Sequence, residues 1–397
     1  MDPHIEHLMQ QISGFVYPNE IELRWSLLIV IYPYITGLVA GAFILASLNK
    51  VFKVKELQPT YRLSLLAALA FLLVAPLPLL LHLGHPERSF QIFLTPHLKS
   101  AMAMFGFVYA WYLMLVLLLE IWFEYRADVV RWGAEAKGLR KLLLWLFTLG
   151  SRDVSAESVG FDKKAVYTIT IIGIPSAFIL HGYVGFIFGS VKANPWWSSV
   201  LIPIVFLFSA IVSGIALVLL LYYVSALLRG QQPSMTCLDK LASFLFYALI
   251  LDLSLETLDF IHRLYESEES ITILSELIYS KLFLSLTILQ VLIGTIIPLV
   301  MLAFARFSRL PDELKRMGYF IAAILIQIGI FSTRWNVVIG GQLFSKSLRG
   351  LTVYRMEYAG LEGLFSSIIL LIMPLVILYV LVKFLPPWES AKASPAS

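Results

Sequence analysis

Residues 201–227 read LIPIVFLFSAIVSGIALVLLLYYVSAL and contain no charged side chain. About 20 consecutive apolar residues are enough for an α-helix to cross the hydrocarbon core of a bilayer. Inside a bilayer every backbone polar group must be satisfied internally, which a helix achieves by itself. The stretch therefore predicts a membrane-spanning helix, and this decides the class of the whole protein.

The same pattern continues along the chain. Of its 397 residues, 59% are hydrophobic and 14% are charged, and the mean hydropathy is +0.82. A soluble domain of this size needs far more charge to cover its surface. We therefore predict an all-α fold, a polytopic transmembrane helix bundle embedded in the lipid membrane. The predicted spans are residues 26–48, 63–83, 101–123, 165–189, 201–227, 241–262, 279–305, 318–341 and 364–384.

Lys and Arg are unevenly distributed between the loops, and this predicts the orientation. Two thirds of the 30 basic residues fall in segments on one face, including the stretch from Arg126 to Lys164. Short cytoplasmic loops are enriched in Lys and Arg. We therefore expect a bacterial inner (cytoplasmic) membrane protein with a periplasmic N-terminus and a cytoplasmic C-terminus. The net charge of +4 arises from these loops and does not indicate nucleic-acid binding.

Two short runs of small residues suggest an internal repeat. Thr36–Ala42 reads TGLVAGA, and Ser209–Ile215 reads SAIVSGI. Small residues spaced four apart let helix backbones approach closely. We infer two parallel four-helix repeats plus an additional helix; chance similarity between apolar helices is the alternative. The predicted parts are a periplasmic tail (1–25), a first bundle (26–189), a second bundle (190–341), and a periplasmic loop, last helix and cytoplasmic tail (342–397).

Several ionisable or hydroxyl side chains lie inside the predicted spans or at their ends. A charge at the bilayer centre costs at least ~2.5 kcal/mol, so such groups are candidates for function. They are His82, His85, Glu87 and Arg88 after the second span, Glu120 in the third, His181 and Tyr183 in the fourth, Asp252, Glu256, Asp259 and Arg263 in the sixth, and Arg334 in the eighth.

The acids among these groups suggest proton transfer. Asp252, Glu256, Asp259 and Arg263 follow the spacing i, i+4, i+7 and i+11, which is one helical stripe. Such a stripe suits a proton relay; the alternative is that the acids pair with Arg334 or Lys281 and only stabilise packing. Glu120 lies near the cytoplasmic end of the third span and suggests a proton route from that side. The alternative is that its carboxylate extends to the membrane interface and has no part in proton transfer.

The chain offers few ligands for metals or haem. Its single cysteine, Cys237, excludes an internal disulfide, a four-cysteine zinc site and an iron–sulfur cluster held by this chain alone. The positions of its seven histidines exclude two stacked haems, which need facing histidine pairs inside the bundle. We expect no metal and no haem, although a single haem near the periplasmic face is left open.

Short motifs in both halves of the chain resemble a known family. They are LGHPERSF at 83–90, HGYVGF at 181–186, PWW at 195–197, RWN at 334–336 and GGQ at 340–342. Together with the runs of small residues, their order and spacing resemble the NrfD/PsrC family of membrane subunits, found in polysulfide reductase, alternative complex III and the quinone reductase complex of sulfate reducers.

The resemblance implies a subunit that binds menaquinone or another quinone near the periplasmic face, in the first bundle. It implies electron exchange with a periplasmic ferredoxin-like iron–sulfur subunit, with a molybdopterin-type or multihaem cytochrome subunit beyond. Tyr183 matches the family's quinone-site tyrosine. His82 stands where the family often has Asp, and Tyr32 and Tyr34 occupy the stretch where it often has His or Asn.

The candidate residues follow from both lines of reasoning. A quinone needs hydrogen-bond donors for its carbonyl oxygens and titratable groups nearby. The quinone-binding candidates are Tyr183, His181, His82, Tyr32, Tyr34 and Arg88. The proton-transfer candidates are His82, His85, Glu87, Asp252, Glu256, Asp259, Arg334 and Glu120.

Two other classes of function stay open at this point. A secondary transporter also has internal repeats and buried charge, but it tends to bind substrate where helices break near the midplane. A purely structural anchor holds a partner without binding quinone, but it has no need to bury ionisable groups. Coupling of quinone chemistry to proton translocation is a further hypothesis that the sequence alone does not decide.

Overall fold

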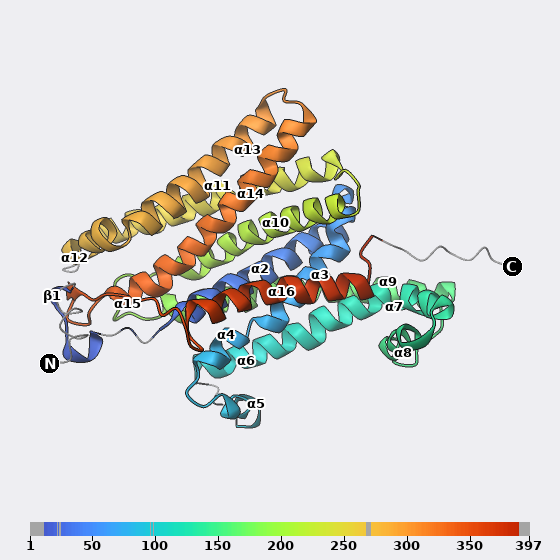
Figure 1. Ribbon diagram of the computed structural model, residues 1–397, viewed down its shortest axis with the longest axis horizontal. Coiled ribbons are helices and arrows are strands. Elements are labelled where there is room, and N and C mark those ends of the chain that lie inside the picture. The colour runs from blue at the N-terminus through green and yellow to red at the C-terminus, as the bar shows by residue number, and fades with distance from the viewer. Residues whose placement is uncertain are drawn as a thin grey trace.

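The computed structural model describes residues 12–388, apart from Glu22, Arg24, Pro96, Leu98 and residues 267–270. Within this part of the chain, nine helices are long and apolar enough to cross a membrane. They run side by side along the long axis of the molecule (Figure 1). The predicted all-α polytopic bundle is confirmed. The spans are Leu27–Lys50, Lys55–His82, Met104–Glu135, Ala156–Gly189, Ile202–Leu228, Met235–Arg263, Phe283–Phe307, Asp312–Leu343 and Leu364–Phe384.

The first four spans pack together. The first span is α2 (Leu27–Lys50), and the fourth is α9 (Ala156–Gly189). The second span consists of η2 (Lys55–Leu57), α3 (Gln58–Val74) and α4 (Leu77–His82). The third span consists of α6 (Ala101–Trp111), the π-helical η4 (Tyr112–Leu117) and α7 (Leu118–Glu135). The short elements η3 (Pro86–Arg88), α5 (Gln91–Leu94) and α8 (Gly138–Phe147) lie in the connections. Helix α9 begins at Ser155, whose side chain accepts a hydrogen bond from the Ser158 backbone N–H.

The next four spans form a second group. They are α10 (Ile202–Leu228), α11 (Met235–Glu266), the π-helical η6 (Phe283–Ile296) continued by α13 (Ile297–Phe307), and α14 (Asp312–Trp335) continued by the π-helical η7 (Asn336–Gly340) and α15 (Gly341–Leu343). Helix α12 (Ile271–Glu276) and η5 (Leu277–Lys281) precede η6. The last span, α16 (Leu364–Phe384), packs mainly on α3 and α2 (Figure 1).

The two groups meet where α2 crosses α10. A Cβ atom built on Gly214 would lie 2.3 Å from the Gly41 carbonyl carbon, and one on Gly41 would lie 2.0 Å from the Ala210 carbonyl oxygen. Only glycine allows such a close approach of the two backbones. The two small-residue runs noted in the sequence therefore pack against each other and form the seam between the groups.

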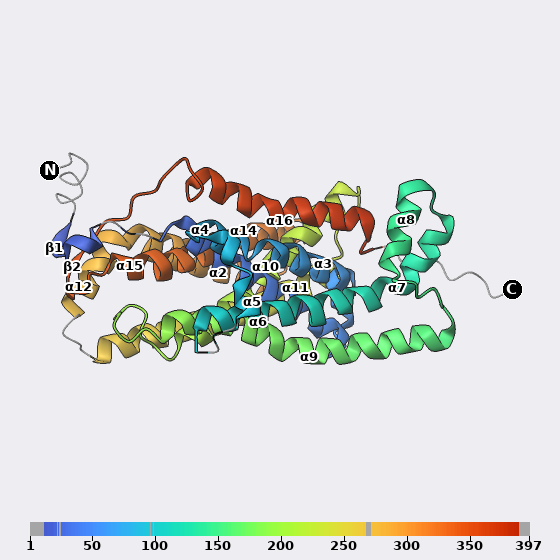
Figure 2. The same ribbon diagram turned by 90° about the horizontal axis from the view of Figure 1, so that it is seen from below.

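The two ends of the bundle differ. At one end β1 (Ser13–Phe15) pairs antiparallel with β2 (Arg349–Leu351), and η1 (Pro18–Glu20) follows β1. We call this the sheet end. At the other end α8 lies across the direction of the spanning helices, and we call this the α8 end (Figure 2). The basic segment 126–164, predicted to be cytoplasmic, lies at the α8 end; residues 1–11 and 389–397, on which the predicted terminal locations depend, lie outside the described residues.

Candidate functional site

A buried arginine and a buried histidine lie at the seam. Arg334 of α14 and His181 of α9 are each 0% exposed, and the Arg334 Nη2 atom lies 3.2 Å from His181 Nε2. Arg334 Nη2 also donates to Ser209 Oγ of α10 at 2.6 Å, and its guanidinium stacks over the Phe206 ring at 4.1 Å. Three spans from both bundles therefore converge on one cation.

These contacts fix the tautomer of His181. Arginine has only donors, so His181 Nε2 must accept from Arg334, and its proton then sits on Nδ1. Nδ1 lies 3.4 Å from the Thr36 hydroxyl oxygen, while that hydroxyl donates to the Tyr32 carbonyl oxygen at 3.0 Å. In this arrangement His181 is a neutral imidazole that orients Arg334, rather than a cation.

The line continues to two tyrosines near the sheet end. Tyr32, buried in α2, packs edge-on against Phe105. Its side chain lies close enough to Tyr183 for an electrostatic interaction between the two. Tyr183 is half-buried, two residues after His181 in α9. The structure thus brings together Tyr32, His181, Tyr183 and Arg334, which we call the seam line.

Several polar atoms on this line have no hydrogen-bond partner in the described part of the chain. They are Tyr32 Oη, Arg334 Nε, Arg334 Nη1 and, nearby on α11, Asp252 Oδ1. Buried polar groups in native proteins are nearly always satisfied by protein, water or ligand. These atoms of the seam line are therefore expected to bind water or a ligand.

The acids of α11 do not pair directly with Arg334. Asp252 is buried and Glu256 accepts from Gln290 Nε2 at 3.1 Å, while both acids interact with the guanidinium only through the electrostatic field. Gln290 is itself fixed, because its carbonyl oxygen accepts from Asn336 Nδ2 at 2.7 Å. The predicted stripe therefore contains two deep acids beside the seam line, with Arg334 bonded to His181 and Ser209 instead.

The outer part of the same stripe has a structural role. Asp259 accepts from Arg263 Nε at 2.9 Å and from the Ser199 hydroxyl. Arg263 Nη1 in turn donates to the carbonyl oxygens of Pro195 and Trp196. These contacts hold the connection 190–201 against α11. Asp259 therefore has a structural role that Asp252 does not share.

The π-helical turn after Arg334 holds the same connection. A π-turn leaves backbone carbonyl oxygens without their usual helical donors. The indole N–H of Trp196 donates to the backbone carbonyl oxygen of Asn336 at 2.8 Å, and that of Trp197 donates to the backbone carbonyl oxygen of Val337 at 2.6 Å. The PWW motif therefore caps η7 and fixes the helix that carries Arg334.

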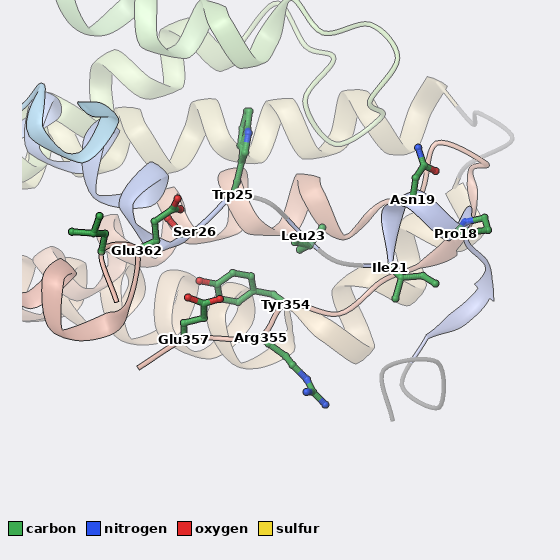
Figure 3. Close-up of a pocket in the computed structure, with 11 residues that line it drawn as sticks. Pro18, Asn19, Ile21, Leu23, Trp25, Ser26, Tyr354, Arg355, Glu357 and Glu362 are labelled. Carbon is green, nitrogen blue, oxygen red and sulfur yellow. The ribbon is translucent and has the colours of Figure 1, made fainter. Parts of the chain in front are cut away.

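A pocket of about 740 Å³ opens at the sheet end between the segments 18–26 and 354–362 (Figure 3). Ser26, at its inner side, precedes Tyr32 by six residues, or about 9 Å along a helix. On its rim, Glu362 Oε2 lies 2.7 Å from His82 Nδ1. Burial and the nearby carboxylates of Glu357 and Glu362 raise the pKa of Tyr354, which faces the same pocket.

The other predicted residues of the 83–90 segment lie apart from the seam line. His85 Nδ1 lies 2.9 Å from Glu87 Oε1, and both side chains are exposed. Arg88 is exposed as well. His181, by contrast, is buried inside the bundle, where it contacts Arg334.

Glu120 occupies a second buried position, towards the α8 end of the first bundle. Its Oε1 accepts from Thr170 at 2.8 Å and from Tyr61 at 3.2 Å, and the side chain is 0% exposed. The Glu120 carboxylate therefore does not extend to the membrane interface. One turn further on, Glu124 pairs with Lys50 at 2.7 Å, and Tyr61 lies between the two acids.

Tyr34 contacts α14, on another side of α2 from Tyr32. Its hydroxyl donates to Gln327 Oε1 at 2.8 Å, and its ring packs edge-on against Phe331. The tyrosine lines a separate apolar groove beside α16. In the described part of the chain, no three His, Cys, Asp or Glu side chains are grouped so that they could hold a metal ion.

The fold and the seam line define a multi-pass integral membrane protein with a polar interior between two helix groups. The chain belongs to the NrfD family, because the family model described as "Polysulphide reductase, NrfD" matches residues 18–346. This confirms the family resemblance seen in the motifs.

Three relatives extend the comparison. The chain is 33% identical over 322 residues to a selenate reductase subunit of Mesobacillus selenatarsenatis, across 79% of this chain and 73% of the relative. It is 28% identical to a putative dimethyl sulfoxide reductase membrane subunit of Halobacterium salinarum, over 59% of this chain and 52% of that one. It is 23% identical to an NrfD homologue of Haemophilus influenzae, over 83% and 97% of the two chains.

Sequence reasoning missed the neutral residues that complete the site. Thr36 and Ser209 contact His181 and Arg334, yet both sit in small-residue runs that indicate only helix packing. Gln290 and Gln327 did carry a signal, because amide side chains inside apolar spans are costly unless they are bonded. Their partners lie on other spans and are not visible in one sequence.

Proposed function

We propose that this chain is the membrane subunit of a respiratory oxidoreductase complex and that it binds menaquinone or another quinone along the seam line. Family membership and relatives named as subunits of selenate and dimethyl sulfoxide reductases support a role in a reductase complex. They favour this function over a secondary transporter. The bacterial inner membrane, with the sheet end periplasmic, is part of the same proposal.

The observation that carries the proposal is that buried donor atoms of Tyr32 and Arg334 have no partner among the described residues. A quinone ring presents two carbonyl oxygens, which are hydrogen-bond acceptors. Tyr32 Oη, which has no partner in the described part of the chain, and half-buried Tyr183 beside it provide hydroxyls for one side of such a ring. Arg334 has two further donor atoms unpaired within the same part. These residues fit the group, and when bound it supplies the two-electron, two-proton chemistry.

The protein's own groups hold this arrangement in place. Thr36 and His181 fix the direction of the Arg334 guanidinium, and Ser209 fixes its depth. Because the site lies in a low-dielectric interior, each oriented donor acts more strongly there than in water. Protons would be exchanged with the sheet-end pocket, which Ser26 and Glu362 line and where Glu362 contacts His82.

The sheet end is also where we place the partner. The chain needs a supplier or acceptor of electrons, and we propose a ferredoxin-like iron–sulfur subunit bound at this end, with a molybdopterin-type or multihaem cytochrome subunit beyond it. Support comes from the exposed aromatic residues there, since such residues are enriched at protein interfaces. They are Phe15, Tyr17, Phe90, Tyr279 and Tyr358.

Quinol-dependent turnover of the purified complex tests the proposal. We expect Tyr183→Phe and Tyr32→Phe each to lower turnover by roughly 3–10-fold, because one hydrogen bond is worth about 0.5–1.5 kcal/mol. Tyr167→Phe, at an exposed tyrosine of α9 away from the sheet end, serves as the matched control. A purely structural anchor predicts unchanged turnover in all three variants and no quinone in an organic extract of the complex.

Coupling to proton translocation is a second part of the proposal. It is supported by acids inside the spans at two levels: buried Glu120 towards the α8 end, and buried Asp252 with half-buried Glu256 beside Arg334. Intramembrane acids at such positions are typical of proton pathways.

A further inference from the structure

A groove of about 870 Å³ separates α16 from the second bundle. Its walls are mainly apolar side chains of α2, α14, α16 and η6, among them Leu38, Leu289, Phe331 and Leu371. This volume is within the usual range of ligand pockets. None of the seam-line residues Tyr32, His181, Tyr183 and Arg334 lines the groove, so it is separate from the proposed quinone site; Tyr34, a candidate from the sequence, lines the groove instead.

The groove extends through one half of the membrane. Along α16 it runs from Leu364 to Leu375, and along α2 from Leu27 to Leu38. Eleven residues of helix rise by about 16 Å. The hydrocarbon core of a bilayer is about 30 Å thick, so the groove matches the depth of a single leaflet.

Two of its polar groups, Lys281 and Ser367, lie near the mouth at the sheet end. Lys281 ends η5, directly before the seventh span, and therefore lies at the level of lipid headgroups. Lys281 also interacts with the protein, but an ammonium group has three donors. Ser367, one turn into α16, lines the groove and is 0% exposed, and its hydroxyl has no partner among the described residues.

We propose that this groove binds one anionic phospholipid. The phosphate lies at Lys281, a glycerol ester carbonyl accepts from Ser367, and an acyl chain follows α16 down to Leu375. The order of cation, hydroxyl and apolar wall along the groove matches the order of phosphate, ester and acyl chain in the lipid. Basic pockets between transmembrane helices are known to favour anionic headgroups.

The deep half of the groove does not suit a quinone ring. Its polar side chains there, Tyr34 and Gln327, already bond to each other at 2.8 Å. Gln327 Nε2 also donates to the Ser213 carbonyl oxygen at 2.7 Å. Tyr34 and Arg334 interact electrostatically, so this side of α2 lies near the guanidinium. A lipid chain over Tyr34 and Gln327 keeps water away from that side.

Native mass spectrometry of the complex in mild detergent, combined with lipid extraction, tests this proposal. The variants are Lys281→Gln, which removes the cation, and Leu371→Trp, which fills the groove. The controls are Lys383→Gln at the α8 end of α16 and Ile369→Trp, an exposed position outside the groove. Melting temperature identifies any variant that misfolds.

We expect the wild type and both controls to retain one phospholipid, and both groove variants to lose it several-fold. After delipidation, phosphatidylglycerol should restore the bound lipid and the melting temperature of the wild type better than phosphatidylcholine. Equal retention in all proteins overturns the proposal. Loss of quinone instead of phospholipid from Lys281→Gln also overturns it, whereas unchanged quinol turnover in that variant leaves the proposed function untouched.

Discussion

The two bundles hold their buried acids in different ways. In the first, Glu120 accepts from two hydroxyls, those of Thr170 and Tyr61. In the second, Glu256 accepts from the amide of Gln290, which is itself held by Asn336. Hydroxyls both donate and accept hydrogen bonds, so they can pass a proton on, whereas an amide N–H only donates.

This difference suggests different roles for the two sets of acids. Glu120 connects through Tyr61 to Glu124 and Lys50 at the α8 end, so it is suited to exchange protons with that surface. Glu256 is fixed in position by amides and, together with Asp252, balances the charge of Arg334. The seam line between them is where the two bundles can be coupled.

The largest effect is expected from breaking the contact between the bundles. In Gly214→Ala the new Cβ would lie 2.3 Å from the Gly41 backbone, and only a separation of α2 and α10 relieves this overlap. Overpacking typically costs about 1–3 kcal/mol or more. We expect a lower folded yield and melting temperature in detergent. Gly318→Ala, with no atom within 4 Å of the new Cβ, is the control; equal melting temperatures would contradict the account of the seam.

Removing the cation of the seam line is expected to have the next largest effect. Arg334→Gln leaves His181 and Ser209 without their donor and leaves two acids without a nearby positive charge. A hydrogen bond to a charged group is worth about 1.5–3 kcal/mol. We expect at least about a hundredfold loss of quinol turnover together with loss of bound quinone. Arg316→Gln, near the α8 end, should behave as wild type, and a fully active Arg334→Gln complex would exclude the seam line as the site.

The smallest effects on quinone chemistry are expected from neutralising one acid of either set. Glu120→Gln and Asp252→Asn keep the shape of each side chain but replace a carboxyl group, which binds and releases a proton, with an amide, which does not. In proteoliposomes we expect both to lose charge movement per electron while quinol oxidation or quinone reduction continues. Glu124→Gln, at a half-buried surface acid, should lose less. Normal pumping in Asp252→Asn would remove the α11 acids from any proton pathway.

The sequence predicted most of the fold because its signals are local. Apolar runs predicted all nine spans, and the runs around Gly41 and Gly214 predicted close helix approach. It did not predict the pairing of β1 with β2, since the two strands lie more than 330 residues apart and are three residues long. The sequence also did not predict the π-helical turns, because these depend on the side chains that pack beside them. At η7 those side chains are Trp196 and Trp197.

The candidate site was predicted only in part, for the same reason. The cost of burying charge pointed to His181, Asp252 and Arg334, but not to which of them bond to each other. Arg334 and His181 are 153 positions apart, and their contact exists only because α2 and α10 cross at glycine. His82, whose place beside the quinone stays a prediction, pairs with Glu362 in the loop before α16, a contact that the sequence did not indicate.

Photoaffinity labelling with an azido-quinone tests the central claim most directly. The complex is irradiated in native membranes, and labelled peptides of this chain are mapped by mass spectrometry. We predict labelling in the segments of α2 and α9 that contain Tyr32 and Tyr183, and its loss when excess unlabelled quinone competes. Labelling confined to the groove between α14 and α16, or no specific labelling of this chain, would contradict the assignment of the quinone site to the seam line.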